Sequence, residues 1–143
     1  MYENYTTQSL PEADYRELLG STLYVFCSNN AFIIGNIINT DDLLSWYELI
    51  DKESGNLKNA IGDTISAKTG NTKTDDLFID IVNMRNRIVH GFGITSSNGE
   101  QILATKMRKN NGNEQFVITQ DYLMDFIKKN KEFSDLLYEY RGY

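Results

Sequence analysis

The chain has 143 residues, 41% of them hydrophobic and 24% charged, which is the composition of a globular protein with one domain. No apolar run approaches the ~20 residues that cross a membrane, and the first residues lack the basic and apolar regions of a signal peptide. The single cysteine, Cys27, cannot form an internal disulfide, so we expect a reducing cytoplasmic location without membrane contact. The formal charge of -6 gives no overall attraction to nucleic acid, so any phosphate contact requires a local basic patch.

The first half of the chain is predicted to be helical. Apolar residues at three- and four-residue spacings predict a long amphipathic helix over residues 9–38, either continuous or broken once. Ser9 is its predicted N-cap, and Pro11 suits its first turn. Thr40 is the predicted cap of a short helix within DDLLSWYELI. A further helix between loops is predicted by the apolar residues Leu57, Ile61 and Ile65.

A second long helix, DDLFIDIVNMRNRIVH, is predicted to begin after a Thr74 cap and to end at Gly91. The runs QILATKMRK and EQFVIT then flank NNGN, which predicts a β-hairpin with its turn at Asn111-Gly112. Thr119 is the predicted cap of the helix QDYLMDFIKKN, and EFSDLLYEY has the apolar spacing of another helix.

The expected fold class is therefore all-α, an antiparallel helical bundle with one small hairpin inserted. We expect a single domain over residues 1–143, with the hairpin at about 101–119 and the C-terminal helices at about 120–141.

Polar residues interrupt the second long helix near its end. At about 100° per residue, one broad arc of this helix is apolar and comprises Leu77, Phe78, Ile81, Val82, Met84, Ile88, Val89 and Phe92. Arg85 lies near the middle of this arc, whereas Asn86 and His90 lie on a polar stripe beside it. A cation on an apolar face requires either a carboxylate on another helix or a cleft at that face, and both interpretations stay open. His90 similarly either bonds the free carbonyls at the helix end or belongs to a site.

The segment RNRIVH is similar to the R-x4-6-H motif of the HEPN superfamily, in the R-N-x-x-x-H form of its ribonuclease members. The resemblance rests on Arg85, Asn86 and His90 and on a helical setting over about residues 9–92. That family is an all-α, commonly dimeric bundle that includes toxins, abortive-infection proteins and the RNA-cutting domains of type VI CRISPR effectors. The resemblance implies a metal-independent endoribonuclease that cleaves single-stranded RNA without a cofactor, in a toxin or phage-defence context.

The resemblance also assigns roles to the three residues. His90 becomes the general acid or base, and Arg85 stabilises the phosphate and the transition state. Asn86 positions either the imidazole of His90 or a phosphate oxygen. An imidazole moves protons near neutral pH, so the residue type fits RNA cleavage without a metal. Some HEPN toxins carry a tyrosine two residues after the histidine as a modified position, whereas Phe92 occupies that place here. Control by that modification is therefore not expected.

Because the chain as a whole is acidic, RNA binding requires a local cluster of cations. The predicted substrate-binding residues are Arg87, Lys106, Arg108 and Lys109. Lys128, Lys129 and Lys131 are the other basic cluster, for which a solvated surface is the default interpretation.

On an ideal helix, Arg85 and His90 point about 140° apart. Both reach one phosphate if the last turn loosens, or if two protomers share the site. We therefore expect a homodimer with the site at its interface. The other expected partners are RNA, without DNA specificity, and an antitoxin or another defence protein.

Other chemistries have less support in the sequence. One histidine and one cysteine exclude a zinc site of the usual composition, and we expect no metal and no cofactor. Cys27 lies in an apolar helical pattern and is expected in the core. Asp76 and Asp80 share a helical face and leave magnesium as an alternative, although a first-turn charge and a solvated face explain them more simply. The alternative function is a non-catalytic HEPN-type helical module that binds RNA, a nucleotide or a protein partner.

Overall fold

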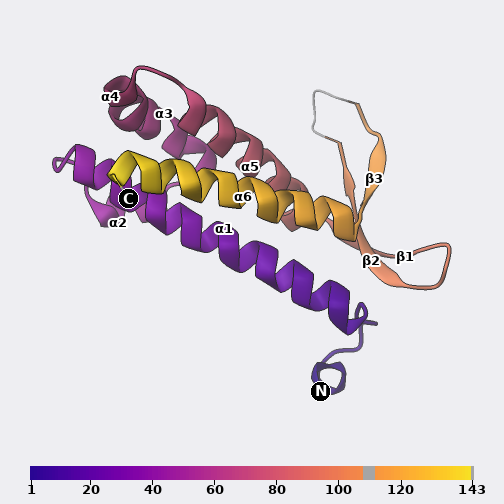
Figure 1. Ribbon diagram of the computed structural model, residues 1–143. Helices are drawn as coiled ribbons and strands as arrows, with labels where there is room; N and C mark the ends of the chain where they lie inside the picture. Colours follow the sequence, from indigo (N-terminus) through magenta and orange to yellow (C-terminus); the bar gives the residue numbers. More distant parts are fainter. Residues whose placement is uncertain (108–111, 143) are drawn as a thin grey trace.

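Figure 1 shows a bundle of helices with a small antiparallel sheet at one end. The computed structural model describes residues 1–107 and 112–142. The helical elements are η1 (Tyr2–Tyr5), α1 (Ala13–Thr40), α2 (Trp46–Asp51), η2 (Ser54–Asn56), α3 (Leu57–Ile61), η3 (Gly62–Ser66), α4 (Ala67–Thr69), α5 (Lys73–Val89) and α6 (Gln120–Arg141). The strands are β1 (Phe92–Thr95), β2 (Gln101–Lys106) and β3 (Gln115–Ile118), in the order β1-β2-β3.

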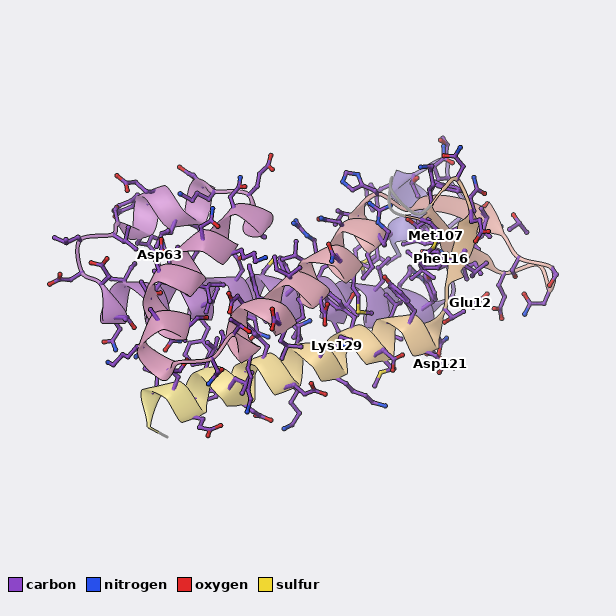
Figure 2. All side chains as sticks on the ribbon, turned by 90° about the horizontal axis from the view of Figure 1, so that it is seen from above. Glu12, Asp63, Met107, Phe116, Asp121 and Lys129 are labelled. Atoms are coloured by element: carbon purple, nitrogen blue, oxygen red, sulfur yellow. The ribbon has the colours of Figure 1, made fainter. Side chains whose placement is uncertain are left out.

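Three long helices, α1, α5 and α6, form the body of the bundle and lie lengthwise beside one another, with the sheet near Met107 and Phe116 at one end (Figures 1 and 2). Their apolar faces meet in one continuous core, in which Phe78 of α5 stacks on Phe133 of α6 with ring centroids 5.5 Å apart. The largest fully buried side chains are Phe78, Phe126, Phe133, Ile33, Ile34, Ile37, Leu49, Leu57, Ile61, Ile65, Ile81 and Ile118. Burial of this apolar area is the main term that favours the fold.

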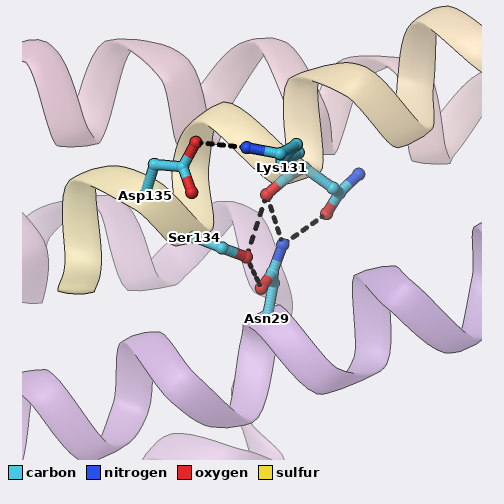
Figure 3. Close-up of polar contacts among 5 residues, drawn as sticks. Asn29, Lys131, Ser134 and Asp135 are labelled. Atoms are coloured by element: carbon cyan, nitrogen blue, oxygen red, sulfur yellow. Dashed lines mark hydrogen bonds and ion pairs between the residues drawn. The ribbon is translucent and has the colours of Figure 1, made fainter.

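A buried polar cluster joins α1 to α6 within this core (Figure 3). The Asn29 side-chain amide donates to the backbone oxygen of Asn130 at 2.8 Å and to its Oδ1 at 3.0 Å. Ser134 Oγ donates to Asn29 Oδ1 at 2.6 Å, and Asn130 Nδ2 donates to the backbone oxygen of Phe126 at 2.9 Å. Because buried amides are costly without partners, this cluster fixes the register of the two helices.

The sheet corrects the all-α expectation, because the chain is mostly helical but carries a three-stranded sheet. The predicted hairpin is confirmed: β2 pairs antiparallel with β3, from Leu103 opposite Ile118 to Lys106 opposite Gln115. The predicted turn residue Asn111 lies outside the described residues, and Gly112 has the positive φ, 86°, that such a turn favours. The strand β1 was not predicted, since a four-residue run with a central glycine is too short to show alternation.

The hydroxyl of Tyr15, in the first turns of α1, joins the helices to the sheet. It accepts from the Leu103 N–H at 3.1 Å and donates to the Ile118 oxygen at 2.7 Å, and these two residues face each other across β2 and β3. Burial raises the pKa of the Tyr15 phenol, against a smaller opposing effect of the Leu103 N–H. The phenol is therefore neutral and is able to donate at physiological pH.

Removing this hydroxyl should destabilise the protein. We expect Tyr15→Phe to lower the free energy of unfolding by about 1–3 kcal/mol, because it leaves the Leu103 N–H and the Ile118 carbonyl without their shared partner. Urea titration of the two proteins measures the difference. Tyr24→Phe is the matched control, since Tyr24 lies on the same helix and is exposed, and it should leave the midpoint unchanged. Equal stability of Tyr15→Phe and the unmodified chain would contradict the assignment.

The helix boundaries differ from the predicted caps at three places. The long first helix is continuous, but it begins at Ala13 with Glu12 as N-cap, so Ser9 does not cap it. Thr40 is the last residue of α1, and its hydroxyl donates to the Asn36 oxygen one turn earlier, so it does not cap the next helix. The N-cap of α5 is Thr72, and Thr74 is buried within the first turn.

Other helix predictions are confirmed or extended. Thr119 caps α6 by accepting from the Tyr122 N–H at 3.1 Å. The two predicted C-terminal helices form a single helix, because the amide of Asn130, near its middle, is bonded to Phe126 and Asn29. The predicted helix around Leu57, Ile61 and Ile65 is confirmed as α3, η3 and α4 in succession, with all three residues fully buried. Its central turn, η3, is a π-helix.

The composition of α1 bears on the expected absence of a membrane-spanning segment. By length and composition alone, its 28 residues would suffice to cross a membrane. The same properties belong to a helix at the centre of a bundle, and α1 packs along α6 with Ile33, Ile34 and Ile37 fully buried. Bundle packing buries 28% of the apolar stretch of α1, so it accounts for only part of this composition, and the helix does not establish a location.

Candidate active site

Arg85, Asn86 and His90 line one open cleft, although an ideal helix would direct the side chains of Arg85 and His90 apart. The cleft has a volume of about 520 Å³ and lies between the last two turns of α5 and the segment that joins α2 to η2. The remaining lining residues are Lys52, Glu53, Ser54, Gly55 and Val89. A single protomer thus presents all three motif residues to one space.

His90 lies at the end of α5. It is the C-cap, with φ -95° and ψ 13°, so the backbone leaves helical geometry after this residue. Its backbone N–H still donates to the Asn86 oxygen at 3.0 Å, whereas its side chain is exposed. The imidazole and Arg85 line the same cleft because that cleft extends along the last two turns of α5.

Gly91 ends the helix, but for a different reason from the one predicted. It does not adopt the positive φ of a glycine C-cap. A Cβ at this position would lie 2.9 Å from the Ile88 oxygen and 3.2 Å from the Ala104 oxygen. The close approach of α5 to β2 therefore requires glycine immediately after His90, and it fixes the direction in which the chain leaves the helix.

Arg85 is held by an aromatic ring. Its guanidinium carbon lies 5.0 Å from the centroid of the Phe26 ring on α1, in a cation–π contact. Within the part of the chain that the structure describes, Arg85 forms no ion pair with a carboxylate, and its buried Nε has no hydrogen-bond partner. Of the two interpretations open for this residue, the cleft is therefore the one that the structure supports.

The electrostatics of Arg85 follow from this setting. Desolvation lowers the pKa of its guanidinium, and the nearby Cys27 thiol and Glu53 carboxyl raise it in opposition. An arginine starts from so high a pKa that it stays protonated in a protein at physiological pH. Arg85 thus brings to the cleft a partly desolvated positive charge that no carboxylate neutralises by direct contact.

Two of the predicted substrate-binding residues, Arg87 and Lys106, lie outside the cleft. Arg87 Nη1 donates to the backbone oxygen of Lys106 at 2.6 Å, which ties α5 to the end of β2, and neither residue lines the cleft. Arg108 and Lys109 lie outside the described residues. Besides Arg85, the cleft is lined by the cation Lys52, which has no sequence signal because it stands alone in a polar loop.

Cys27 is exposed, so its predicted core position is wrong. It follows Phe26, which faces the core, and a step of about 100° along the helix carries it to the outer side. Asp76 accepts from the Thr72 hydroxyl at 2.8 Å, in the first turn of α5, and Asp80 is exposed. In residues 1–107 and 112–142, no group of three or more histidine, cysteine, aspartate or glutamate side chains is placed to hold a metal ion.

Sequence reasoning identified the motif but missed what completes the site. The ring of Phe26 lies 59 positions before Arg85 and carries no polar signal. The 52–55 segment has the composition of an ordinary loop, and only the packing of η2 against α5 brings it to the motif. No family model, no curated protein and no solved structure matches this chain.

Proposed function

We propose that this protein is a metal-independent endoribonuclease of HEPN-like type that cleaves single-stranded RNA. One observation carries the proposal: Arg85, Asn86 and His90 line a single cleft, and the Arg85 guanidinium has no carboxylate partner in the described chain. A buried ion pair would have made Arg85 structural, whereas a cation at a cleft with no carboxylate in direct contact favours an anionic ligand, against the more distant charge of Glu53. The motif resemblance makes that ligand the phosphate of an RNA backbone.

The residues suit transesterification of RNA. The imidazole of His90 takes the proton of a 2′-hydroxyl, and the oxygen then attacks the neighbouring phosphorus atom. The bond from phosphorus to the 5′-oxygen breaks, and that oxygen leaves with a proton returned by an imidazolium. The products are a 2′,3′-cyclic phosphate and a 5′-hydroxyl. Arg85 offsets the charge on the phosphate oxygens, and Asn86, one turn before His90, positions the imidazole or a phosphate oxygen.

The first test is cleavage in the presence of a chelator. We expect the purified protein to cut single-stranded RNA in EDTA and to leave 2′,3′-cyclic phosphate ends, because a histidine and an arginine supply the proton transfer and the charge. A DNA strand of the same sequence should remain intact, since it lacks the attacking 2′-hydroxyl. Gel electrophoresis measures the cleavage of the RNA and the DNA strand, and assignment of the end groups identifies the cyclic phosphate. Full loss of activity on chelation would contradict the proposal and point to Asp76 and Asp80.

We further propose that the active form is a homodimer with the cleft at its interface. The reaction needs one proton removed and another delivered, and each protomer has one histidine. Two copies packed along α5 would place two imidazoles and two Arg85 cations near one strand, where they concentrate positive charge in an acidic protein. Val89, which lines the cleft and is exposed, offers apolar area for this contact. The proposed setting is cytoplasmic, with an antitoxin or another defence protein as further partner.

Assembly is measured by the mass in solution. We expect twice the 16.4 kDa of one chain, and a crystal of the dimer should place the two His90 side chains on facing surfaces. A monomer that still cleaves RNA would refute the shared site. Two His90 side chains on opposite outer surfaces would refute it as well.

A non-catalytic module that binds a protein partner is the second candidate function. The observation that favours it is a row of exposed apolar side chains at α2, where Leu43 is 90% and Tyr47 80% exposed, beside the half-exposed Trp46 and Ile50. Exposed apolar clusters mark interaction surfaces. Absence of RNA cleavage under all the conditions above, with the fold intact, would favour this candidate.

A further inference from the structure

One face of the sheet carries an exposed aromatic side chain close in sequence to the cleft residue His90. In the register of the three strands, Phe92 of β1, Ala104 of β2 and Val117 of β3 lie opposite one another, so their side chains share a face. Ala104 is buried, whereas Phe92 and Val117 are 41% and 40% exposed. The edge of this face that Phe92 occupies is therefore open to solvent.

The position of Phe92 is fixed relative to His90. One residue separates them along the chain, so their Cα atoms lie at most about 7 Å apart. That residue is Gly91, whose close approach to Ala104 sets the exit direction from α5. β1 then pairs with β2 from Phe92 onward, opposite Ala104. The ring is therefore carried by a paired strand, two residues from His90, rather than by a free loop.

A cation shares this face. Lys106 lies two positions after Ala104 on β2, so its side chain projects on the side of Phe92. The Arg87 bond to the backbone oxygen of Lys106 holds this end of the strand against α5. Ala104, between them, is buried, whereas Phe92 is exposed and Lys106 partly exposed. Proteins use an exposed aromatic ring with a nearby cation to bind single-stranded nucleic acid, with a base stacked on the ring and a phosphate at the cation.

We propose that Phe92 is a base-stacking platform that positions single-stranded RNA for the cleft. A base adjoining the phosphate at Arg85 and His90 stacks on the Phe92 ring, and the backbone continues across the sheet toward Lys106. The inference rests on the proposed ribonuclease function and adds a substrate preference to it. The enzyme selects an unpaired strand, because a base within a duplex must first unpair and unstack to reach the ring. Stacking tolerates any base, so little sequence preference arises at this position.

The test measures RNA affinity without cleavage. In a His90→Ala background, the binding of a short fluorescein-labelled single-stranded RNA is followed by anisotropy for a series of Phe92 variants. We expect Phe92→Ala to weaken binding about tenfold, the usual loss of one stacked base. Phe92→Leu should weaken it equally, since leucine is apolar but has no π face. Phe92→Trp should retain binding within about twofold. Thermal unfolding of each variant establishes that it is folded.

Tyr47→Ala is the matched control, because Tyr47 is an exposed aromatic residue on α2, at the end of the bundle away from the sheet (Figure 1). It should leave RNA affinity unchanged. If the Leu variant binds as tightly as Phe92, the contact is merely apolar and the stacking proposal is wrong. If Phe92→Ala binds normally while the unmodified protein cleaves RNA, this inference fails and the proposed function stands.

Two further outcomes would also overturn the inference. If Phe92→Ala turns a dimer into a monomer at unchanged RNA affinity, the ring belongs to an interface between copies. If the unmodified protein neither binds nor cleaves RNA, the proposed function fails and the stacking role fails with it. A loss confined to Ala and Leu, with Trp and the Tyr47 control unaffected, supports the platform.

Discussion

His90→Ala is expected to abolish RNA cleavage while leaving the protein folded. Removal of a general acid–base group costs about 10²–10⁴-fold in rate, and no second histidine in the chain can replace it. The His90 side chain is exposed at the end of α5, so its loss should change the free energy of unfolding by less than about 0.5 kcal/mol. Single-turnover cleavage and urea unfolding of the same preparation measure the two quantities.

Asp80→Asn is the matched control for this experiment. Asp80 is exposed on the same helix and does not line the cleft, so its cleavage rate should equal that of the unmodified protein. A large drop in stability with activity retained in His90→Ala would make the histidine structural. Loss of activity in Asp80→Asn would instead direct attention to the carboxylates of α5 and to a metal.

Asn29→Ala should produce a large loss of stability with no change at the cleft. The substitution removes the partner of the Asn130 side-chain oxygen, the donor to the Asn130 backbone oxygen and the acceptor of the Ser134 hydroxyl (Figure 3). Because Asn130 is fully buried, water cannot replace the lost partner without opening the interface between α1 and α6. We expect the free energy of unfolding to fall by about 2–3 kcal/mol.

The control for this prediction is the exposed pair of Lys131 and Asp135 on α6, which Figure 3 also shows. Lys131 forms an ion pair with Asp135 at 2.8 Å, but both side chains are exposed. The hydrogen bond and charge of Asp135 raise the pKa of Lys131, yet solvent screens such a pair, so Lys131→Ala should not shift the urea midpoint measurably. Equal losses in the two variants would show that the buried amides have no special contribution.

The predictable part of the fold is the part with periodic apolar residues. The helices α1 and α5 follow from such spacing, and α6 follows as helical but was predicted as two helices. The pairing of β2 with β3 follows from two β-type runs around an Asn-Gly turn. The caps were harder to predict, because a threonine can bond backward into its own helix, as Thr40 does, or be buried in the first turn, as Thr74 is. The π-helical turn η3 left no pattern, since its surroundings keep a helical spacing.

The motif of the candidate site was predictable, whereas its surroundings were not. The motif residues are adjacent in sequence, so inspection of one helix finds them. Their environment comes from distant segments: Phe26 from α1, and Lys52 with Glu53 from the loop after α2. An arginine on an apolar helix face suggests a carboxylate partner or a cleft. Neither the spacing nor the charge of Arg85 predicts that an aromatic ring from another helix contacts it. Cys27 was misplaced because it stands one residue from the core-facing Phe26.

The pairing of α1 with α6 has a consequence for folding during synthesis on the ribosome. The partners of Asn29 and Tyr15 are 101 and 103 positions further along, in α6 and β3, whereas α2, α3 and η3 pack on α1 and are made much earlier. At a synthesis rate of ~5–20 residues per second, the contacts with α6 and β3 follow those residues of α1 by roughly 5–20 s. During this time the side of α1 that packs on α6 stays uncovered. Chaperones that hold such segments should therefore determine how much of the nascent chain reaches its native state.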